Sequence, residues 1–272
     1  MTATVTVTVT DEVTRRILDS AKYRHLDPGL VRRLADEACQ RFRNSGQAEK
    51  YARRKLHQAF GAFVSGPSAR AVQDAVAAVQ SGTSGLAEAG RAAMRAHASS
   101  AERLDWLDPF YHQVAGWCGE PRSVADLACG LNPLAIPWMR LAPGARYWAC
   151  EIDHALVAAL ARLDDIMPAR VEVTTCDLVA SPPELAADVA FLLKTMTTME
   201  QQAGGATARV LRNLACRHVI VSVPRHSLSG RLTYRDDAGA SVRQLAESSG
   251  YEVSDEAAIG DELIFHLTPS CR

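Results

Sequence analysis

The sequence predicts an α/β fold: a seven-stranded, Rossmann-like sheet behind an N-terminal all-helical domain. Three observations support this prediction. Apolar residues in roughly the first hundred positions recur with a helical period. From residue 123 onward, short β-type segments alternate with helical stretches, which is typical of a mainly parallel sheet covered on both faces. The last two β-type segments are separated only by a short glycine-containing link, which predicts an antiparallel hairpin.

Length and composition exclude several classes of protein. The chain has 272 residues, which suits two domains or one large domain with an extension, and with 47% hydrophobic residues it is too apolar for a disordered chain. It has no uncharged apolar run of about 18 residues, so we expect no membrane span, and its first residues lack the features of a secretory signal. Seven cysteines without a CxxC pair argue against a disulfide framework and a metal site, and favour the cytoplasm.

Charge is distributed unevenly along the chain. Residues 1–105 carry 16 basic and 11 acidic side chains, a net charge of +5, whereas residues 106–272 carry 14 and 20, a net charge of −6. The basic excess is densest in residues 15–55, where the net charge is +7. Such an excess predicts contact with a polyanion, although solvated helix faces would give the same pattern. Because the charge changes sign there, we expect a basic helical domain at 1–104 and a second domain at 105–272.

Helical periodicity and helix-start signals define the elements of the N-terminal part. Thr and Val alternate over residues 2–10, which we interpret as a loose arm. Asp27-Pro28 is a strong start signal, because aspartate caps a helix and proline fits its first position. The apolar stripes predict five helices, at residues 11–18, 28–43, 47–62, 67–80 and 85–97.

A further helix start is predicted at Ser99. Ser99 and Glu102 form a capping-box pattern, in which each side chain bonds to the backbone amide of the other residue. We expect this helix to continue toward Trp117, with an interruption near Pro109.

The second part of the chain contains seven β-type segments, with helical stretches such as 154–165 and 206–214 between them. A seven-stranded sheet closed by a hairpin is the architecture of the class I methyltransferases that use S-adenosylmethionine, although topology alone does not settle function. The predicted strands are at residues 123–128, 146–150, 171–175, 188–193, 218–223, 251–255 and 262–267.

Candidate ligand-binding residues follow the first three strands, because open α/β sheets bind ligands at the carboxyl ends of their strands. Gly130 allows close approach of backbone to a ligand, but a loop with one glycine is a poor match to a dinucleotide fingerprint and also fits a simple turn. Asp153 can accept hydrogen bonds from ribose hydroxyls or can cap the next helix. Asp177 can accept from an adenine amine, and Leu178 can cover a purine face.

Lys194 directly follows the fourth, buried strand. Because burying a lone ammonium group is costly, this side chain must reach solvent, a carboxylate or a ligand. In this position the ammonium group would face the methyl group that such an enzyme transfers, or the base that receives it. A salt bridge to Glu200 or to another carboxylate is the alternative that we keep open.

Longer motifs resemble a known family, the aminoglycoside-resistance 16S ribosomal RNA methyltransferases of the Arm/Fmr type. These enzymes modify N7 of a decoding-site guanine, guanosine 1405. The similarity spans most of the chain, and DLACGLNP together with LLKT is its most specific part. The matching segments are EKYARRKLHQAFGAFV (49–64), HASSAERLDWLDPFY (97–111), DLACGLNPLAIPWM (126–139), EIDHALV (151–157), CDLVA (176–180), LLKTMTTMEQQ (192–202), SVPRHSLSGR (222–231) and GDELIFHL (260–267).

The resemblance implies a role for each matched residue. The cofactor would be S-adenosylmethionine, with S-adenosylhomocysteine as product and no metal. Residues that would contact it are Arg103, Ala128, Gly130, Asp153, Asp177, Leu178 and Leu193. Residues near the target base would be Lys194, Glu200 and Glu262. Residues that would contact RNA are Arg53, Arg54, Lys55, Arg225 and Arg231.

The chain departs from the family pattern in the loop near the target base. It has Arg225-His226 where the family has Thr-Lys, and it lacks Lys-Gly-Met after Arg231. Arg225 and Arg231 would preserve the positive charge of this loop.

The implied function is methylation of the small ribosomal subunit by a cytoplasmic, monomeric enzyme. Guanine N7 has a lone pair and no proton, so its attack needs no general base, and catalysis would come from alignment. Aromatic side chains such as Trp106, Tyr111 and Trp138 would stack on the base or pack in the core. Two alternatives stay open at this point: a small-molecule methyltransferase, which leaves the basic N-terminal part unexplained, and a catalytically silent ribosome-binding homologue.

Overall fold

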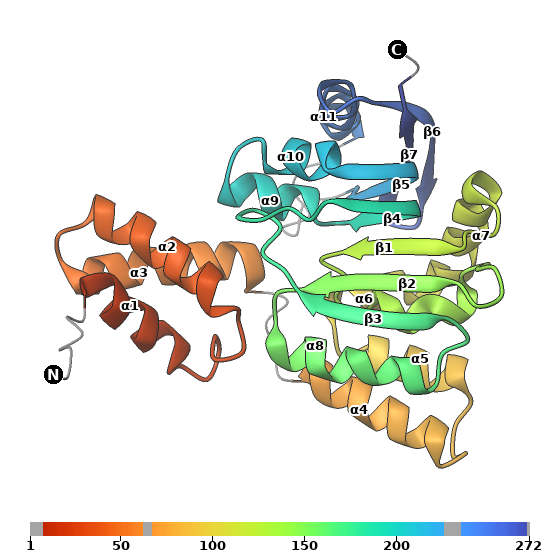
Figure 1. Cartoon of the computed structure of the whole chain (residues 1–272), viewed down its shortest axis with the longest axis horizontal. Helices are drawn as coiled ribbons and strands as arrows, with labels where there is room; N and C mark the ends of the chain where they lie inside the picture. The colour runs from red at the N-terminus through yellow and green to blue at the C-terminus, as the bar shows by residue number, and fades with distance from the viewer. Residues whose placement is uncertain (1–7, 62–66, 226–234, 271–272) are drawn as a thin grey trace, which may run out of the picture.

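The protein consists of a three-helix bundle beside a seven-stranded sheet that carries helices on both faces (Figure 1). The structure is a computed structural model and describes residues 8–61, 67–225 and 235–270. Most of the expected Thr-Val arm lies outside these ranges. Within them, no helix has both the length and the apolar character needed to cross a bilayer. The predicted α/β class with an N-terminal helical region is confirmed.

Each helix of the bundle begins at a polar cap. Thr8, Asp27 and Asn44 accept a hydrogen bond from a backbone amide of the first turn through a side-chain oxygen. The apolar stripes of the three helices meet in one core that includes Ile17 and Leu56. Helical periodicity therefore predicted these elements, and only their ends differ. They are α1 (Val9–Leu18), α2 (Pro28–Arg41) and α3 (Ser45–Phe60).

Two further helices, α4 (Pro67–Gln80) and α5 (Leu86–Met94), follow the bundle in the chain but pack on the sheet (Figure 1). Their buried residues Val76 and Met94 belong to the core that covers one sheet face, and not to the core of the bundle. The predicted domain boundary at residue 104 was based on charge. Within the described chain, α1–α3 have a hydrophobic core of their own, whereas α4 and α5 share the core of the sheet.

Seven strands form one sheet, as predicted. They are β1 (Ser123–Leu127), β2 (Arg146–Glu151), β3 (Arg170–Thr175), β4 (Leu185–Leu193), β5 (Leu214–Pro224), β6 (Tyr251–Ile259) and β7 (Glu262–Pro269). Their order is β3-β2-β1-β4-β5-β7-β6. The first five are parallel, and β7 runs antiparallel to β5 and β6, which confirms the terminal hairpin. The order reverses between β1 and β4, which is where ligands bind in sheets of this type.

The two faces of the sheet have separate cores because side chains alternate along each strand. In β4, Val189 and Phe191 enter one core, and Ala190 and Leu192 enter the other. Besides α4 and α5, the first face carries α7 (Leu107–Cys118), the 3-10 helix η2 (Asn132–Trp138) and α8 (His154–Leu160). The second face carries α9 (Met196–Gln202), α10 (Ala206–Arg212) and α11 (Arg235–Ser248).

The predicted capping box at Ser99 is wrong. The N-cap of the helix there, α6 (Ala98–Arg103), is His97, two residues before Ser99, and this N-cap makes no side-chain capping hydrogen bond. The carboxylate of Glu102 instead accepts a hydrogen bond from the ammonium group of Lys194, 2.6 Å away. A hydrogen bond between two charged groups is stronger than one to a neutral amide, so the distant lysine takes the place of the local cap.

Candidate functional site

The carboxyl ends of β1, β2, β3 and β4 open into one cavity of about 1060 Å³, part of which is open to solvent. Helices α6 and α9 supply further wall, and Ala59 and Phe60 at the end of α3 reach the same cavity. The sequence-predicted residues that line it are Arg103, Ala128, Gly130, Asp153, Asp177, Leu178, Leu193 and Lys194. Residues more than ninety positions apart in the chain thus meet around one volume, as expected at this edge of a parallel sheet.

The loop after β1 is wound tightly around the cavity. Ala128 and Gly130 both have a left-handed backbone, with φ of 55° and 52°. A side chain on Gly130 would come within 3.0 Å of the His97 ring, so glycine is needed there for conformation and for space. Lys194 is also left-handed, with φ of 58°. Such backbone in non-glycine residues costs about 1–3 kcal/mol each and concentrates at functional sites.

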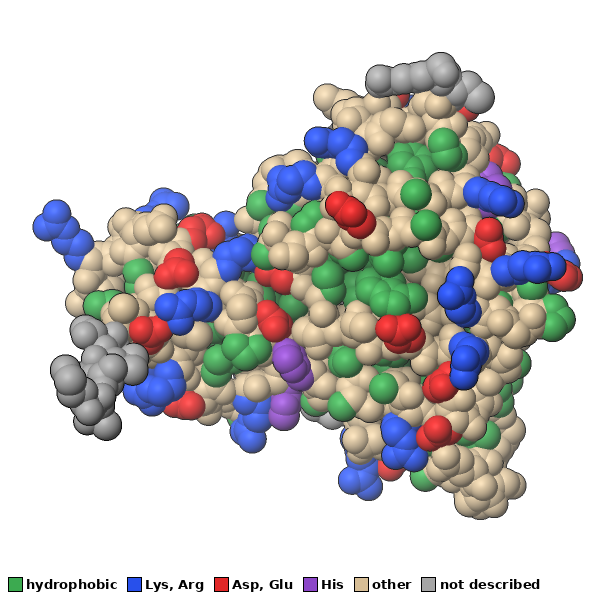
Figure 2. Space-filling view, in the orientation of Figure 1, with side chains coloured by type: hydrophobic (Ala, Val, Ile, Leu, Met, Phe, Trp, Pro, Cys, Tyr) green, Lys and Arg blue, Asp and Glu red, His purple; other side chains and the backbone are tan. Residues whose placement is uncertain are grey.

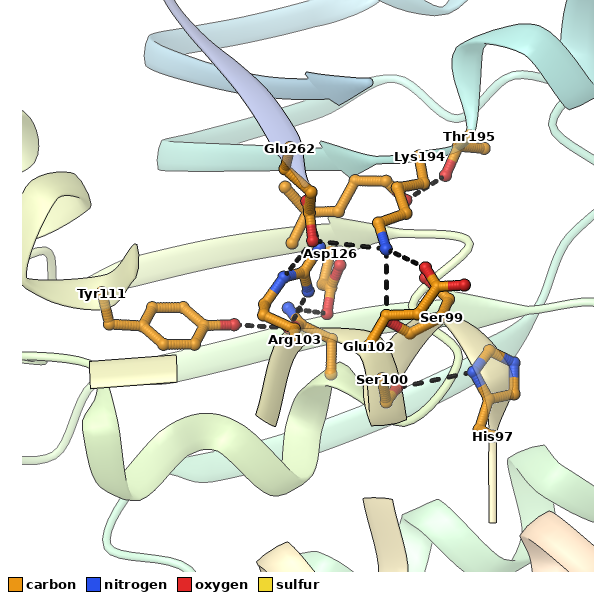
Figure 3. Close-up of polar contacts among 12 residues, drawn as sticks. His97, Ser99, Ser100, Glu102, Arg103, Tyr111, Asp126, Lys194, Thr195 and Glu262 are labelled. Atoms are coloured by element: carbon orange, nitrogen blue, oxygen red, sulfur yellow. Dashed lines mark hydrogen bonds and ion pairs between the residues drawn. The ribbon is translucent and has the colours of Figure 1, made fainter. Parts of the chain in front are cut away.

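A buried ion network lies beside the cavity (Figure 3). Arg103 donates to both carboxylate oxygens of Glu262, from Nε at 2.9 Å and from Nη2 at 2.7 Å. The Nζ atom of Lys194 lies 3.3 Å from the same carboxylate and 2.6 Å from that of Glu102. The Glu262 side chain is 0% exposed. Burial opposes its ionisation, but Arg103 and Lys194 outweigh burial and lower the pKa of Glu262 below its ordinary value. This network holds the loop of Lys194 against α6 and the start of β7.

A second buried polar group surrounds Asp126, at the end of β1. Asp126 accepts from the hydroxyl of Tyr147 at 2.5 Å and from the side-chain amide of Asn132 at 3.0 Å. Tyr111 in turn donates to Asn132. Burial raises the pKa of Asp126 to about 6, against the pull of its hydrogen-bond donors. Tyr111 is therefore a core residue that orients Asn132, and it is not placed to stack on a base.

The other two aromatic candidates also pack inside the protein. Trp106 is half-buried against Gly260, where an added Cβ would overlap its indole ring. Trp138 packs beside the core of the first sheet face, and the guanidinium of Arg91 lies 4.9 Å from the centre of its ring. Of the two roles predicted for these side chains, the structure favours core packing.

Asp153 and Asp177 both line the cavity and are both held by local backbone amides. Asp153 Oδ1 accepts from the amides of Ala155 and Leu156, which makes it the N-cap of α8. Asp177 Oδ1 accepts from the amides of Val179 and Ala180 in the same manner. Capping and cavity lining thus occur together, so the two roles predicted for Asp153 do not exclude each other.

Glu200 lies away from the cavity at the strand ends. Its carboxylate accepts from the backbone amides of Gly205 and Thr207, at 2.7 and 2.8 Å, at the start of α10. It is not among the residues that line the cavity, and the described ion pairs of Lys194 are with Glu102 and Glu262 instead. The physical reason is that α9 directs Glu200 toward the unpaired amides of the next helix, which a carboxylate caps well.

The basic residues predicted to contact RNA have different environments. Arg53 is half-buried and donates to Glu49 and to the backbone oxygen of Arg16, so it holds α1 against α3. Arg54 is exposed, with its guanidinium near the Tyr51 ring, and the Lys55 ammonium is also close to that ring. On the face shown in Figure 2, the Lys and Arg side chains of the bundle are interspersed with acidic ones.

Arg225 lies at the end of β5 and donates to the backbone oxygen of Gly260 at 3.0 Å. Arg231 lies outside the described residues, so its predicted role has no structural counterpart here.

Several residues of the site were not singled out from the sequence. His97, Asn132 and Glu151 line the cavity, and Glu151 Oε2 accepts from the amide of Gly130 at 2.9 Å. Each lies inside or beside a motif that was recognised, so the signal was present. The sequence alone does not show that the side chains of these three residues point into the cavity, because that depends on how the loops fold.

One group within the described residues has the composition of a metal site: Cys118, His218 and His266. Their ligand atoms lie within 4.8 Å of one another, and the rings of His218 and His266 share a 2.8 Å hydrogen bond. None of the three lines the cavity. This group is therefore separate from the candidate site.

Comparison with known proteins agrees with this geometry. The chain matches the ribosomal RNA methyltransferase (FmrO) family over residues 19–266. It belongs to this family. A methyltransferase relative from Micromonospora olivasterospora, named 16S rRNA (guanine(1405)-N(7))-methyltransferase, is 54% identical over 258 residues, which cover 93% of this chain and 86% of that protein. A relative from Serratia marcescens with the same name is 33% identical, with 92% and 94% covered.

Solved structures of two 16S rRNA methyltransferases have the same fold as this chain. The 16S rRNA methylase RmtB has a TM-score of 0.79 and 29% identity, with 97% of this chain and 100% of that chain covered. The 16S rRNA methyltransferase RmtF, in complex with S-adenosylhomocysteine, has a TM-score of 0.81 and 27% identity, with 96% and 98% covered. The predicted class I methyltransferase sheet is confirmed.

Proposed function

We propose that the chain transfers the methyl group of S-adenosylmethionine to N7 of guanosine 1405 of 16S rRNA, and thereby confers aminoglycoside resistance. The observation that carries the proposal is the cavity at the carboxyl ends of β1–β4, lined by the family's loops in a chain that is 54% identical to a named guanine-N7 methyltransferase. The identity over almost the whole chain, including the bundle, favours this function over a small-molecule methyltransferase.

The lining of the cavity suits the chemistry of S-adenosylmethionine. Arg103 offers a cation for the methionine carboxylate, and Ala128, Gly130 and Leu193 would surround the methionine part. Asp153 and Asp177 supply carboxylates for the ribose hydroxyls and the adenine amine, and Leu178 would cover the adenine ring. When bound, this cofactor supplies an electrophilic methyl group.

The residues of the chain would accelerate the reaction by alignment. The N7 lone pair needs no base and no metal, and holding two reactants in line contributes roughly 7–11 kcal/mol in favourable cases. Lys194 lies at the cavity beside the buried carboxylate of Glu262, which fixes the position of its ammonium group. On its major-groove edge a guanine has two acceptors, O6 and N7, so Lys194 can donate to O6 and hold N7 toward the methyl group.

The basic N-terminal region, residues 1–104, would dock the enzyme on the small ribosomal subunit. Arg54 and Lys55 on α3, and Arg225 at the end of β5, would contact phosphates, together with Arg231, which lies outside the described residues. Arg53 would act mainly by holding α1 against α3, which presents its neighbours. The enzyme would act as a monomer in the cytoplasm, where ribosomes are.

The test uses purified small subunits and a methyl donor. Borohydride and aniline treatment cleaves RNA at N7-methylguanine, so primer extension then stops at the modified base. We expect one strong stop at guanosine 1405 and growth of a sensitive host on kanamycin and gentamicin. Cofactor binding without a stop supports the silent homologue, and activity confined to metabolites supports the small-molecule enzyme.

A further inference from the structure

The three-helix bundle is attached to the loops that line the cofactor cavity. The backbone segment before α2 pairs with the loop after β2: the amide of Asp27 donates to the oxygen of Ile152 at 3.0 Å, and that of His154 donates to the oxygen of His25 at 2.7 Å. The same loop carries Asp153. The three-helix bundle is therefore hydrogen-bonded to the loop that carries Asp153, whose carboxylate lines the cavity.

The second attachment is made by Arg33 of α2. Its Nε and Nη2 atoms both donate to Oδ2 of Asp177, at 3.0 and 2.9 Å. Nη2 also donates to the side-chain oxygen of Gln202 on α9, at 3.0 Å. The side chains of Arg33 and Asp177 are 28% and 11% exposed, so water screens this ion pair only in part.

These contacts hold the Asp177 carboxylate from two sides. Backbone amides of its own loop hold Oδ1, and the guanidinium of Arg33 holds Oδ2. An acceptor that is fixed before the ligand arrives loses no rotational freedom on binding, whereas a carboxylate held at one oxygen can turn. Arg33 comes from 144 residues away in the chain.

The bundle also forms part of the cavity wall. Ala59 and Phe60, at the end of α3, line the same volume as Asp177 and Leu178. This contact is independent of the ion pair, because it comes from a different helix and involves apolar atoms.

We infer that the bundle completes the adenine end of the cofactor site, with Arg33 as the positioning residue that holds Asp177. The inference rests on the proposed function, since it assumes that Asp177 accepts a hydrogen bond from the exocyclic adenine amine. Arg33 is not among the residues that line the cavity. It acts through Asp177, and its effect is confined to ligands that have the amine.

The experiment compares Arg33→Gln with Arg32→Gln in the full chain. Arg32 is the preceding residue of the same helix, but its side chain is exposed and pairs with Asp11 of α1, in the same bundle. Isothermal titration calorimetry would measure the binding of two ligands, S-adenosylhomocysteine and S-inosylhomocysteine, which lacks the amine. We expect Arg33→Gln to weaken S-adenosylhomocysteine binding about tenfold and to leave the inosine analogue within about twofold, since only the former uses the charged acceptor. Arg32→Gln should bind both ligands as the wild type does.

Two further variants make the outcome decisive. Asp177→Asn should reduce the preference for the adenine ligand at least as much as Arg33→Gln does. Arg33→Lys, which keeps one charged donor, should restore part of the preference. If Arg33→Gln folds and keeps the wild-type preference, or loses affinity for both ligands equally, the inference is overturned. Wild-type protein that binds neither ligand would instead refute the proposed function itself.

Discussion

Two ion-pair systems lie at the same edge of the sheet, and they differ in what they connect. The first joins Arg103, Glu262 and Lys194 within the sheet and its own helices, with the carboxylate fully buried. The second joins Arg33 of the bundle to Asp177 at a junction that solvent partly reaches. The buried system therefore belongs to the folding of the sheet domain, whereas the junction couples two bodies that have separate cores.

The largest expected effect on the free energy of unfolding is that of Glu262→Ala. It leaves the buried guanidinium of Arg103 without its partner, and removing one member of a buried pair destabilises a protein by about 3–5 kcal/mol. Urea unfolding measures the loss. Glu256→Ala, which removes an exposed ion pair with Arg243, is the matched control and should cost less than about 1 kcal/mol. Equal losses in the two variants would contradict the division into buried and exposed systems.

Lys194→Ala tests whether the lysine of the buried system serves methylation and not folding. Arg103 still pairs with Glu262 in this variant, so folding and cofactor affinity should be nearly retained. Methylation of small subunits should fall at least tenfold, because a positioned donor at the target base contributes on the order of 10²-fold. Single-turnover rates and calorimetry on the same preparation measure both quantities. A wild-type rate would remove Lys194 from the proposed mechanism.

Arg54→Glu tests the bundle as an RNA-binding surface. The side chain is exposed, and its guanidinium is near the Tyr51 ring, so stability and cofactor binding should not change. Affinity for the small subunit should fall, and the slope of its logarithm against the logarithm of salt concentration should decrease in size by about 1 for each phosphate that the variant no longer binds. Arg162→Glu, on the sheet domain, is the control with an exposed arginine. Equal subunit affinity in all three proteins would contradict docking by this helix.

The smallest expected effect concerns Asp126 and pH. Burial raises the pKa of this carboxyl to about 6, from an ordinary value of 3.8. Between these two values the folded protein takes up a proton that the unfolded chain does not, so the contribution of Asp126 to stability increases as pH falls through that window. Asp126→Asn should therefore flatten the difference in urea midpoint between pH 7 and pH 5. A steeper pH dependence in the variant would show that another group dominates.

Much of the fold followed from local patterns. Apolar segments predicted all seven strands. The reason is clearest for central strands such as β1 and β4, because a strand buried on both faces needs continuous apolar residues. Asp27 was correctly identified as a helix cap, and the placement of Gly130 and Asp177 after strands put them at the cavity. The packing of α4 and α5 on the sheet was not predicted, since an apolar stripe does not specify which surface it meets.

The sequence by itself determined the fold class, the family and the strand ends that meet at the cavity, because these depend on periodicity and on short motifs. Only the tertiary structure decided which charges pair. In the folded chain, Lys194 pairs with Glu102 and Glu262, and Arg33 pairs with Asp177. Glu200 accepts from a backbone amide at the start of α10. The physical reason is that an ion pair forms between side chains a few ångströms apart, and that separation depends on how distant elements pack, which local sequence does not encode.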